Sequence, residues 1–231
     1  MRAELESLLR ARKLDVTLTT TASRQRRSAD DLAATGLAVL DEALGGGFRR
    51  GQLSEIIGAR SSGRTTALCH VLAAAAARGE LVALIDTFDR FDPATAAAAG
   101  LDLSKLLWVR EAGDAARALK AAMLVLQAGG FGVVAFDLAD VRPPALRAFP
   151  FTTWLRLARA IESSETVALL VASEHLARSP CGVTLALEPP LGALESPLEM
   201  PRARWEGTSH RARLLHGVTL RPRVVSAAGG R

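Results

Sequence analysis

A short glycine-bounded loop carries the side chains whose types and spacing suit phosphate binding. Its residues are Gly58, Ala59, Arg60, Ser61, Ser62, Gly63, Arg64, Thr65 and Thr66. A strand-like run precedes the loop and a helix-like run follows it, which is the context that a phosphate-cradling loop requires. Glycines let backbone N–H groups turn inward, the helix N-terminus adds partial positive charge, and Thr65 is placed to ligate Mg²⁺. The loop therefore predicts a nucleotide site, and a glycine-rich turn without a ligand is the alternative.

One position of this loop departs from the motif, because Arg64 stands where the motif has lysine. A lysine ammonium is a compact point charge, whereas a guanidinium is longer, planar and fork-shaped. Arg64 can still bind a phosphate bidentately, but it cannot take the lysine position unless the loop shifts. The candidate cofactor-binding residues of this loop are Gly58, Ser61, Ser62, Gly63, Arg64, Thr65 and Thr66.

Around this loop, strand-like runs alternate with helical runs. Strands are predicted over 52–57, 81–86, 106–109, 132–137 and 166–172, and helices over 36–44, 65–78, from 92, 114–128 and 152–161. Apolar strands that are separated by helices predict an α/β fold with a mostly parallel sheet covered on both faces. Further strand-like stretches follow at 183–187, 202–205, 210–215 and 218–225. Because no helix separates them, we expect antiparallel strands at the C-terminal end of the sheet.

The chain divides into a core and two appendages. Residues 1–34 form an N-terminal arm with an amphipathic helix over 4–14, a strand over 15–19 and a basic linker; residues 35–225 form the core; residues 226–231 are predicted to be a disordered tail. The arm has too few apolar residues for a core of its own. It therefore packs on the main domain, binds a partner or moves freely.

The composition limits the cellular locations and the partners that are consistent with this protein. The formal net charge is +5, and only Lys13, Lys105 and Lys120 of the 29 basic residues are lysines. This arginine excess is consistent with a nucleic-acid surface or an acidic protein partner, and equally with compositional drift. Cys69 and Cys181 are not spaced as metal ligands, and no apolar run suits a signal peptide or a membrane span. We expect a cytoplasmic protein with no membrane contact.

The arginines near the C-terminus suggest a second kind of surface. They are Arg202, Arg204, Arg211, Arg213, Arg221 and Arg223, and they often alternate with other residues on strand-like stretches. Alternation on a strand places such side chains on one face. That face suits the phosphates of DNA or an acidic surface, and the alternative is a face that is simply solvated.

Several segments match one protein family in order and in spacing. They are Thr35-Gly36-Leu37, the run 40–47, the run 51–66, Ile85-Asp86, Phe91-Asp92-Pro93, the run 99–107 and the strand ending in Asp137. In these segments the sequence resembles the bacterial RecA recombinases, over roughly residues 35–225. The resemblance implies a RecA-like core built around a P-loop. It also implies that Asp137 belongs to the second nucleotide-binding motif and is a further candidate cofactor-binding residue, which contacts Mg²⁺ through water; a helix cap or loop anchor is the alternative.

The departures from that family fall at its catalytic positions. In active members a glutamate that orients the attacking water follows two residues after the position of Asp86, and this chain has Phe88 there. A glutamine that senses the γ-phosphate ends a later strand, where this chain has Ser173 and Glu174. A carboxylate facing a triphosphate is repulsive unless it is protonated or bridged by a cation. Together with Arg64, these changes argue against ATP hydrolysis.

The DNA-binding loops of the family are also reduced in this chain. The first is replaced by residues 141–144 leading into a helix, and the second shrinks to residues 175–182. A shortened RecA-like chain with degenerate motifs resembles the ImuA branch of the family. That resemblance implies an accessory role in SOS mutagenesis, with an inactive Y-family polymerase-like protein and an error-prone replicative polymerase as partners, and RecA as a further candidate.

The resemblance also implies that no cofactor is required, with residual binding of ATP or ADP with Mg²⁺. Two other functions remain open from the sequence. One is an ATP-dependent, DNA-binding recombinase or ATPase with atypical active-site residues. The other is a RecA-fold cell-division inhibitor.

Overall fold

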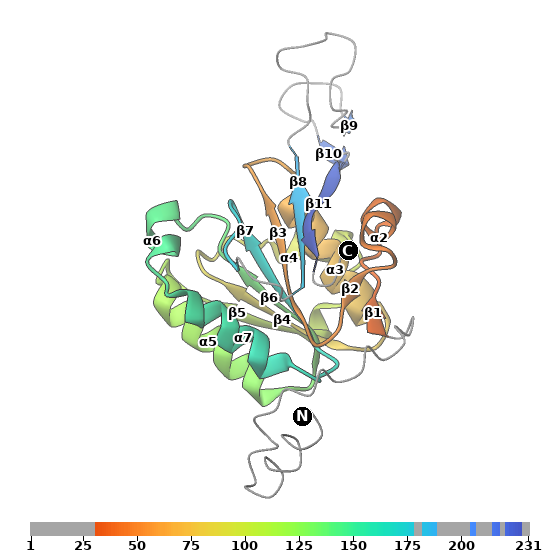
Figure 1. Ribbon diagram of the computed structural model, residues 1–231. Coiled ribbons are helices and arrows are strands. Elements are labelled where there is room, and N and C mark those ends of the chain that lie inside the picture. The colour runs from red at the N-terminus through yellow and green to blue at the C-terminus, as the bar shows by residue number, and fades with distance from the viewer. Residues whose placement is uncertain (1–30, 178–181, 189–203, 207–213, 218–219, 228–231) are drawn as a thin grey trace, which may run out of the picture.

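A seven-stranded sheet forms the centre of the protein in the computed structural model, which describes residues 31–177, 182–188, 204–206, 214–217 and 220–227 (Figure 1). In spatial order the strands are β11 (Pro222–Ala227), β8 (Val183–Leu187), β3 (Leu53–Gly58), β7 (Val167–Ala172), β6 (Phe131–Asp137), β4 (Leu81–Asp86) and β5 (Leu106–Arg110). Each neighbouring pair is parallel except β11 with β8, which is antiparallel. The expected α/β fold with a mostly parallel sheet is confirmed.

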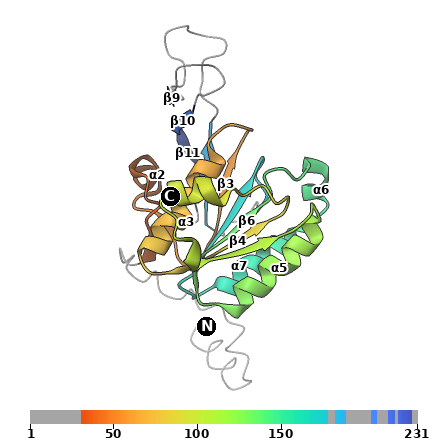
Figure 2. The same cartoon turned by 180° about the vertical axis from the view of Figure 1, so that it is seen from behind.

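Helices cover both faces of this sheet. They are α2 (Ala38–Leu44), α3 (Arg64–Ala77), α4 (Pro93–Ala98), α5 (Ala115–Ala128), α6 (Pro143–Arg147) and α7 (Phe151–Ile161). The first three pack on one face and the last three on the other (Figures 1 and 2). The longest helices have 14 residues, and no helix in the described part of the chain combines the length and apolarity that crossing a membrane requires.

The buried strands divide their side chains between two cores. In β4, Val82 and Leu84 face the core beneath α3, whereas Ala83 and Ile85 face the core beneath α5 and α7. All four side chains are at most 1% exposed. Successive side chains of a strand point to opposite faces, so an uninterrupted apolar run is what a strand covered on both sides requires.

Helix starts follow from capping residues in the sequence. Asp114 caps α5, because its side chain accepts hydrogen bonds from the backbone N–H groups of Ala116 and Arg117. Asp92 caps α4 in the same way, and Pro93 occupies the first helical position, where its missing N–H costs nothing. These caps place the two helices directly after the carboxyl ends of β5 and β4.

The limits of the core differ from the predicted ones at both ends. Leu32 and Ala33, which were assigned to the arm, form strand β1 and pair with β2 (Phe48–Arg49). Ser226 and Ala227, assigned to the tail, belong to β11 and pair with Thr184 and Val183. The predicted arm helix over 4–14 and strand over 15–19 lie outside the described residues.

The antiparallel strands expected at the C-terminal end of the sheet are confirmed, because β11 runs antiparallel to β8. On its other side β8 runs parallel to β3. Strand β9 (Arg204–Glu206) pairs with β10 (Leu214–Gly217) in a separate antiparallel sheet. Periodicity does not encode strand direction, so the parallel pairing of β8 with β3 could not be predicted from it.

Candidate functional site

The predicted phosphate loop lies between β3 and α3, as the sequence requires. Gly63 precedes the helix with φ of 91° and Ser61 has φ of 62°, so the chain turns sharply at both residues. At Gly58, an added Cβ would lie 2.5 Å from both the Ser62 Oγ and the Leu187 carbonyl oxygen. Only glycine fits there, because no other residue permits so close an approach.

Two buried side chains of this loop keep polar atoms without a partner. The Ser62 Oγ and the Arg64 Nη1 have no hydrogen-bond partner among the described residues. Ser62 is 2% exposed and Arg64 is 7% exposed. Leaving a buried donor unpaired costs about 1–3 kcal/mol, and more for a charged group. A phosphate oxygen would satisfy both donors, so the residues present fit an oxyanion at this loop.

Acidic side chains surround the buried guanidinium. Burial lowers the pKa of Arg64, while the carboxylates of Asp137 and Asp140 act to raise it. Burial also raises the pKa of Asp137 to about 6, against the hydrogen bond of 2.9 Å that its Oδ1 accepts from the Ala139 N–H. The neighbouring Asp86 adds to this increase, whereas Arg64 opposes it. Arg64 and Asp137 therefore lie close enough for each charge to shift the pKa of the other.

The remaining predicted site residues occupy different surroundings. Thr65 and Thr66 lie in the first turn of α3, where Thr65 is exposed and Thr66 half-buried. Ser61 is exposed on the loop. No group of three or more His, Cys, Asp or Glu side chains within the described ranges could hold a metal ion. Thr65 and Asp137 are therefore the residues that would contact a Mg²⁺ bound together with a nucleotide.

Asp86 organises the turn that follows β4. Its carboxylate accepts hydrogen bonds from the backbone N–H groups of Arg90 at 3.0 Å and Phe91 at 2.8 Å. The Trp108 Nε1 donates to the same carboxylate at 3.3 Å. Next to it, the Thr87 hydroxyl donates to the Asp137 carbonyl oxygen at 2.5 Å. These bonds join the ends of β4 and β6 and fix the position of residue 88.

Phe88 fills that position with an aromatic ring. The ring packs against the core beneath α5 and α7. It lies so close to Gly113 that an added Cβ there would be 3.1 Å from a ring carbon. An aromatic ring neither accepts a proton nor orients a water molecule, and its packing leaves no carboxylate at this point of the site.

Glu174 is held by a cation. Its carboxylate receives two hydrogen bonds from the Arg147 guanidinium of α6, from Nε at 3.0 Å and from Nη2 at 2.8 Å. The side chains are 31% and 64% exposed, so the pair itself contributes little to stability. This pairing places a positive charge directly on the Glu174 carboxylate. Arg147 was not predicted, because nothing in the sequence links it to a residue so far along the chain.

Glu55 is another residue of this region that the sequence did not lead us to predict. It lies in the middle of β3 and is 2% exposed. Its Oε1 accepts hydrogen bonds from the backbone N–H groups of Leu176 at 3.0 Å and Ala177 at 2.7 Å. Its Oε2 accepts one from the Thr184 hydroxyl at 2.9 Å and contacts the His175 Nδ1. The signal was a single carboxylate inside an apolar strand, which requires buried partners.

His175, which follows Glu174 in the chain, belongs to this network through the contact of its Nδ1 with the Glu55 carboxylate. Glu55 thereby ties the strand that leads into the phosphate loop to the segment after β7 and to β8. The three elements that surround the loop are fixed relative to each other by one buried side chain.

The C-terminal arginine surface is seen only in part. Arg221 and Arg223 are exposed beside and within β11. Arg223 donates from its Nε to the Glu188 carboxylate at 2.6 Å. Arg202, Arg211 and Arg213 lie outside the described residues, so the predicted basic face stays a prediction.

Known proteins match parts of this sequence. Residues 16–145, more than half of the chain, match the RecA N-terminal domain. The RecA protein of Treponema denticola is 37% identical over 117 residues, which are 50% of this chain and 28% of that protein. The RecA protein of Chlorobaculum parvum is 39% identical over 105 residues, which are 45% of this chain and 30% of that protein. The chain thus spans less than a third of the length of these curated relatives.

A solved structure shares the fold. The crystal structure of the RadB recombinase superposes with a TM-score of 0.52 at 20% sequence identity, over 68% of this chain and 83% of that chain. Its sheet and helices correspond at the level of architecture alone. Because the RecA N-terminal domain matches more than half of its residues, the chain belongs to the RecA family.

Proposed function

We propose that this protein is a RecA-fold accessory factor of the DNA damage (SOS) response that does not hydrolyse ATP. It would support error-prone translesion synthesis through contacts with an inactive Y-family polymerase-like protein, an error-prone replicative polymerase and RecA. The observation that carries the proposal is Phe88, whose packed ring stands where hydrolysis requires a water-orienting acid. The Glu174–Arg147 pair and the substitution of Arg64 support it.

The phosphate loop has a reduced role in this proposal. The buried donors of Ser62 and Arg64 suit an oxyanion, and the helix N-terminus adds its partial positive charge. A bound ATP or ADP with Mg²⁺ would be held there by Gly58, Ser61, Ser62, Gly63, Arg64, Thr65, Thr66 and Asp137. Binding would stabilise the fold without a chemical step, since phosphoryl transfer depends on positioned groups and residue 88 carries an aromatic ring in place of a water-orienting acid.

We expect Arg64→Ala to weaken the binding of pyrophosphate and of Mg-ADP by about tenfold or more, because it removes the charged donor of the loop. Isothermal titration calorimetry of both variants measures this. Arg60→Ala, which removes an exposed arginine of the same loop, is the matched control and should change affinity by much less. Equal losses in the two variants would contradict a specific role for Arg64.

A genetic test addresses the function directly. Deleting the gene in its native host should reduce damage-induced mutagenesis while leaving homologous recombination intact. Complementation with Arg64→Ala should restore mutagenesis, because the proposed role needs no turnover. Loss of recombination upon deletion would favour an ATP-dependent recombinase, and a cell-division phenotype with normal mutagenesis would favour a division inhibitor. Either result would overturn the proposal.

A further inference from the structure

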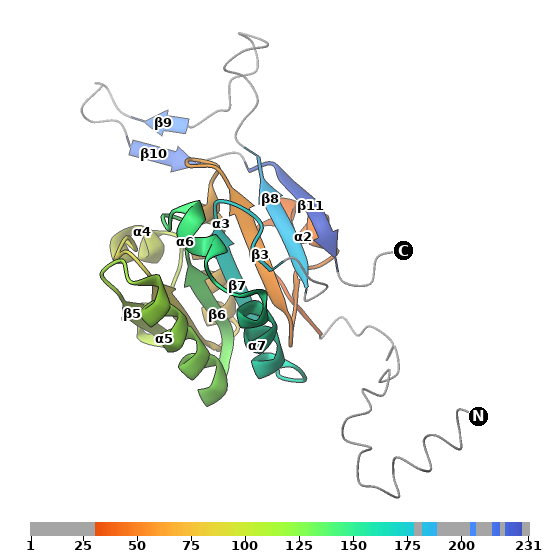
Figure 3. The same ribbon diagram turned by 60° about the vertical axis from the view of Figure 1, so that its left-hand side comes forward.

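An apolar groove with a basic rim lies between α5 and α7, the two longest helices on the face of the sheet opposite α3. It has a volume of about 390 Å³ and is lined by Leu119, Lys120, Met123, Leu124, Thr153 and Arg156. The two helices pack against each other, as Figure 3 shows, and the groove follows their junction. It is remote from the phosphate loop, which lies at the start of α3 on the opposite face. The groove is therefore a feature that the nucleotide site does not use.

The floor of the groove is apolar because of the spacing on α5. Leu119 and Met123 are four residues apart, as are Lys120 and Leu124, so each pair stacks along one helix face. Leu124, which lines the groove, is 66% exposed. An exposed apolar surface that is rimmed by polar residues commonly marks a protein contact.

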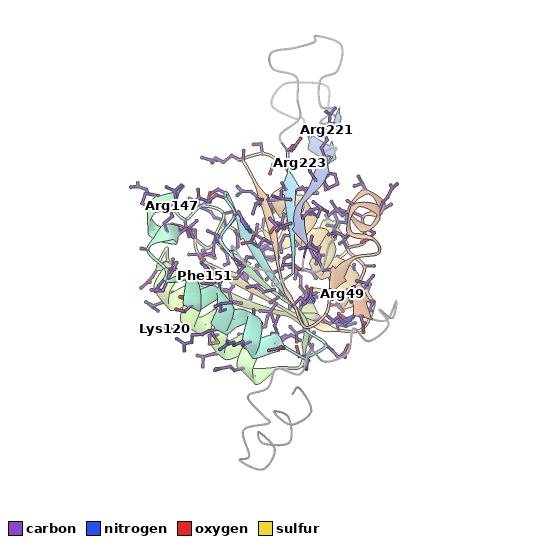
Figure 4. All side chains as sticks on the ribbon, viewed as in Figure 1. Arg49, Lys120, Arg147, Phe151, Arg221 and Arg223 are labelled. Carbon is purple, nitrogen blue, oxygen red and sulfur yellow. The ribbon has the colours of Figure 1, made fainter. Side chains whose placement is uncertain are left out.

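The rim of the groove is positively charged. Lys120 and Arg156 are exposed and line it, and Arg117 and Arg159 are exposed on the same two helices. None of the lining residues is acidic. The carboxylates at the ends of these helices are Asp114, which caps α5, Glu111, which lies 3.6 Å from Arg117, and Glu162 after the end of α7. Figure 4 shows Lys120 on this side of the molecule, with Phe151 above it.

We propose that this groove docks an acidic amphipathic helix of a partner protein. Leucine-like side chains of that helix would cover Leu119, Met123 and Leu124, while its flanking carboxylates would meet Lys120 and Arg156. Helices that lie in a groove are recognised in this way, with apolar anchors at successive turns and charges at the edges. The inference rests on the proposed function in one respect, namely that the protein acts through protein contacts.

Two other occupants fit the groove less well. A nucleic-acid backbone would satisfy the cations but would leave the apolar floor without a partner. The N-terminal segment of this chain carries leucines, but its charges are unfavourable for a basic rim. Over residues 1–13 they are Arg2, Arg10, Arg12 and Lys13 against Glu4 and Glu6. The combination of apolar floor and basic rim therefore favours a separate acidic helix.

A direct binding measurement tests the proposal. The probe is a fluorescein-labelled synthetic helix of about 18 residues, with leucines on one face and glutamates on both flanks. We expect the full-length protein to bind it, and Leu124→Ser to weaken binding about tenfold or more, as truncation of a central apolar anchor does. Lys120→Glu combined with Arg156→Glu should weaken binding comparably and remove its dependence on salt.

Matched control variants distinguish binding at the groove from nonspecific binding elsewhere on the surface. Leu103→Ser changes a leucine that is 41% exposed and lies beside Lys105, whose Nζ contacts the end of α3. Arg221→Glu changes an exposed arginine beside β11. Both variants should bind the probe as the unmodified protein does, and all variants should keep the same melting temperature. A probe with serines in place of leucines should not bind.

Other outcomes would overturn the inference. Failure to bind the acidic helix, or equal loss in the Leu103 control, would remove the groove as its site. Displacement of the probe by a single-stranded oligonucleotide, with Leu124→Ser without effect, would assign the surface to nucleic acid. Tighter binding of a peptide of residues 1–14 would assign it to this chain. All of these measurements omit ATP, so a finding of ATP turnover would refute the proposed function without deciding this one.

Discussion

Replacing Glu55 by alanine should lower the free energy of unfolding by about 3–5 kcal/mol, because each buried hydrogen-bond donor left without an acceptor costs about 1–3 kcal/mol. The variant would leave the buried N–H groups of Leu176 and Ala177 and the Thr184 hydroxyl without an acceptor. It would also open a cavity beside β3. Urea unfolding followed by circular dichroism measures the change, because the midpoint shifts while the slope stays constant.

Two controls sharpen this prediction. Glu55→Gln keeps the shape and one acceptor oxygen, so we expect a loss of intermediate size. Glu42→Ala removes an exposed carboxylate on α2, and it should change stability by at most about 0.5 kcal/mol, as surface substitutions do. A loss below about 1 kcal/mol in Glu55→Ala would show that the network does not fix the segment after β7.

The second large effect is a dependence of stability on pH that comes from Asp137. Its pKa is raised from 3.8 to about 6, mainly by burial, so the native chain binds this proton more tightly than the unfolded chain does. The native state is therefore favoured at low pH, and this advantage is lost as pH rises from about 4 to about 6. Above that window the buried carboxylate costs about 3 kcal/mol, at 1.36 kcal/mol for each pKa unit.

Asp137→Asn removes this cost while leaving an oxygen to accept the Ala139 N–H. We expect the variant to exceed the unmodified protein in stability by about 3 kcal/mol at pH 7.5 and by only about 1 kcal/mol at pH 4.5. Urea unfolding at both pH values gives the difference, and Glu42→Gln serves as the exposed control. A stability difference that did not grow with pH would contradict the raised pKa.

Much of the fold was accessible from local patterns. Strand β4 over Leu81–Asp86 and strand β8 over Val183–Leu187 match their predicted ranges, because a short, unbroken apolar run between turn residues specifies a strand covered on both faces. The helix predicted over 114–128 corresponds to α5, which Asp114 caps in the structure. The phosphate loop was found because its glycines and hydroxyls have a fixed spacing that local structure preserves.

The rest depends on contacts between distant segments. Neither the direction of β8 nor the Arg147–Glu174 pair leaves a local pattern, because each is set by which elements become neighbours. Glu55 did leave a signal, as a charged residue inside an apolar strand, but its partners follow more than a hundred residues later. Sequence reasoning thus located the loop and missed the network that holds its surroundings.

The most direct test of the central claim is phosphate release by the purified full-length protein with Mg-ATP, with and without single-stranded DNA. We expect no release above that of Arg64→Ala, because the packed Phe88 ring replaces the acid that would orient water. A RecA-family recombinase in the same assay is the positive control. Phosphate release that is stimulated by single-stranded DNA and lost in Arg64→Ala would contradict the account, and it would show that this protein is an active ATPase.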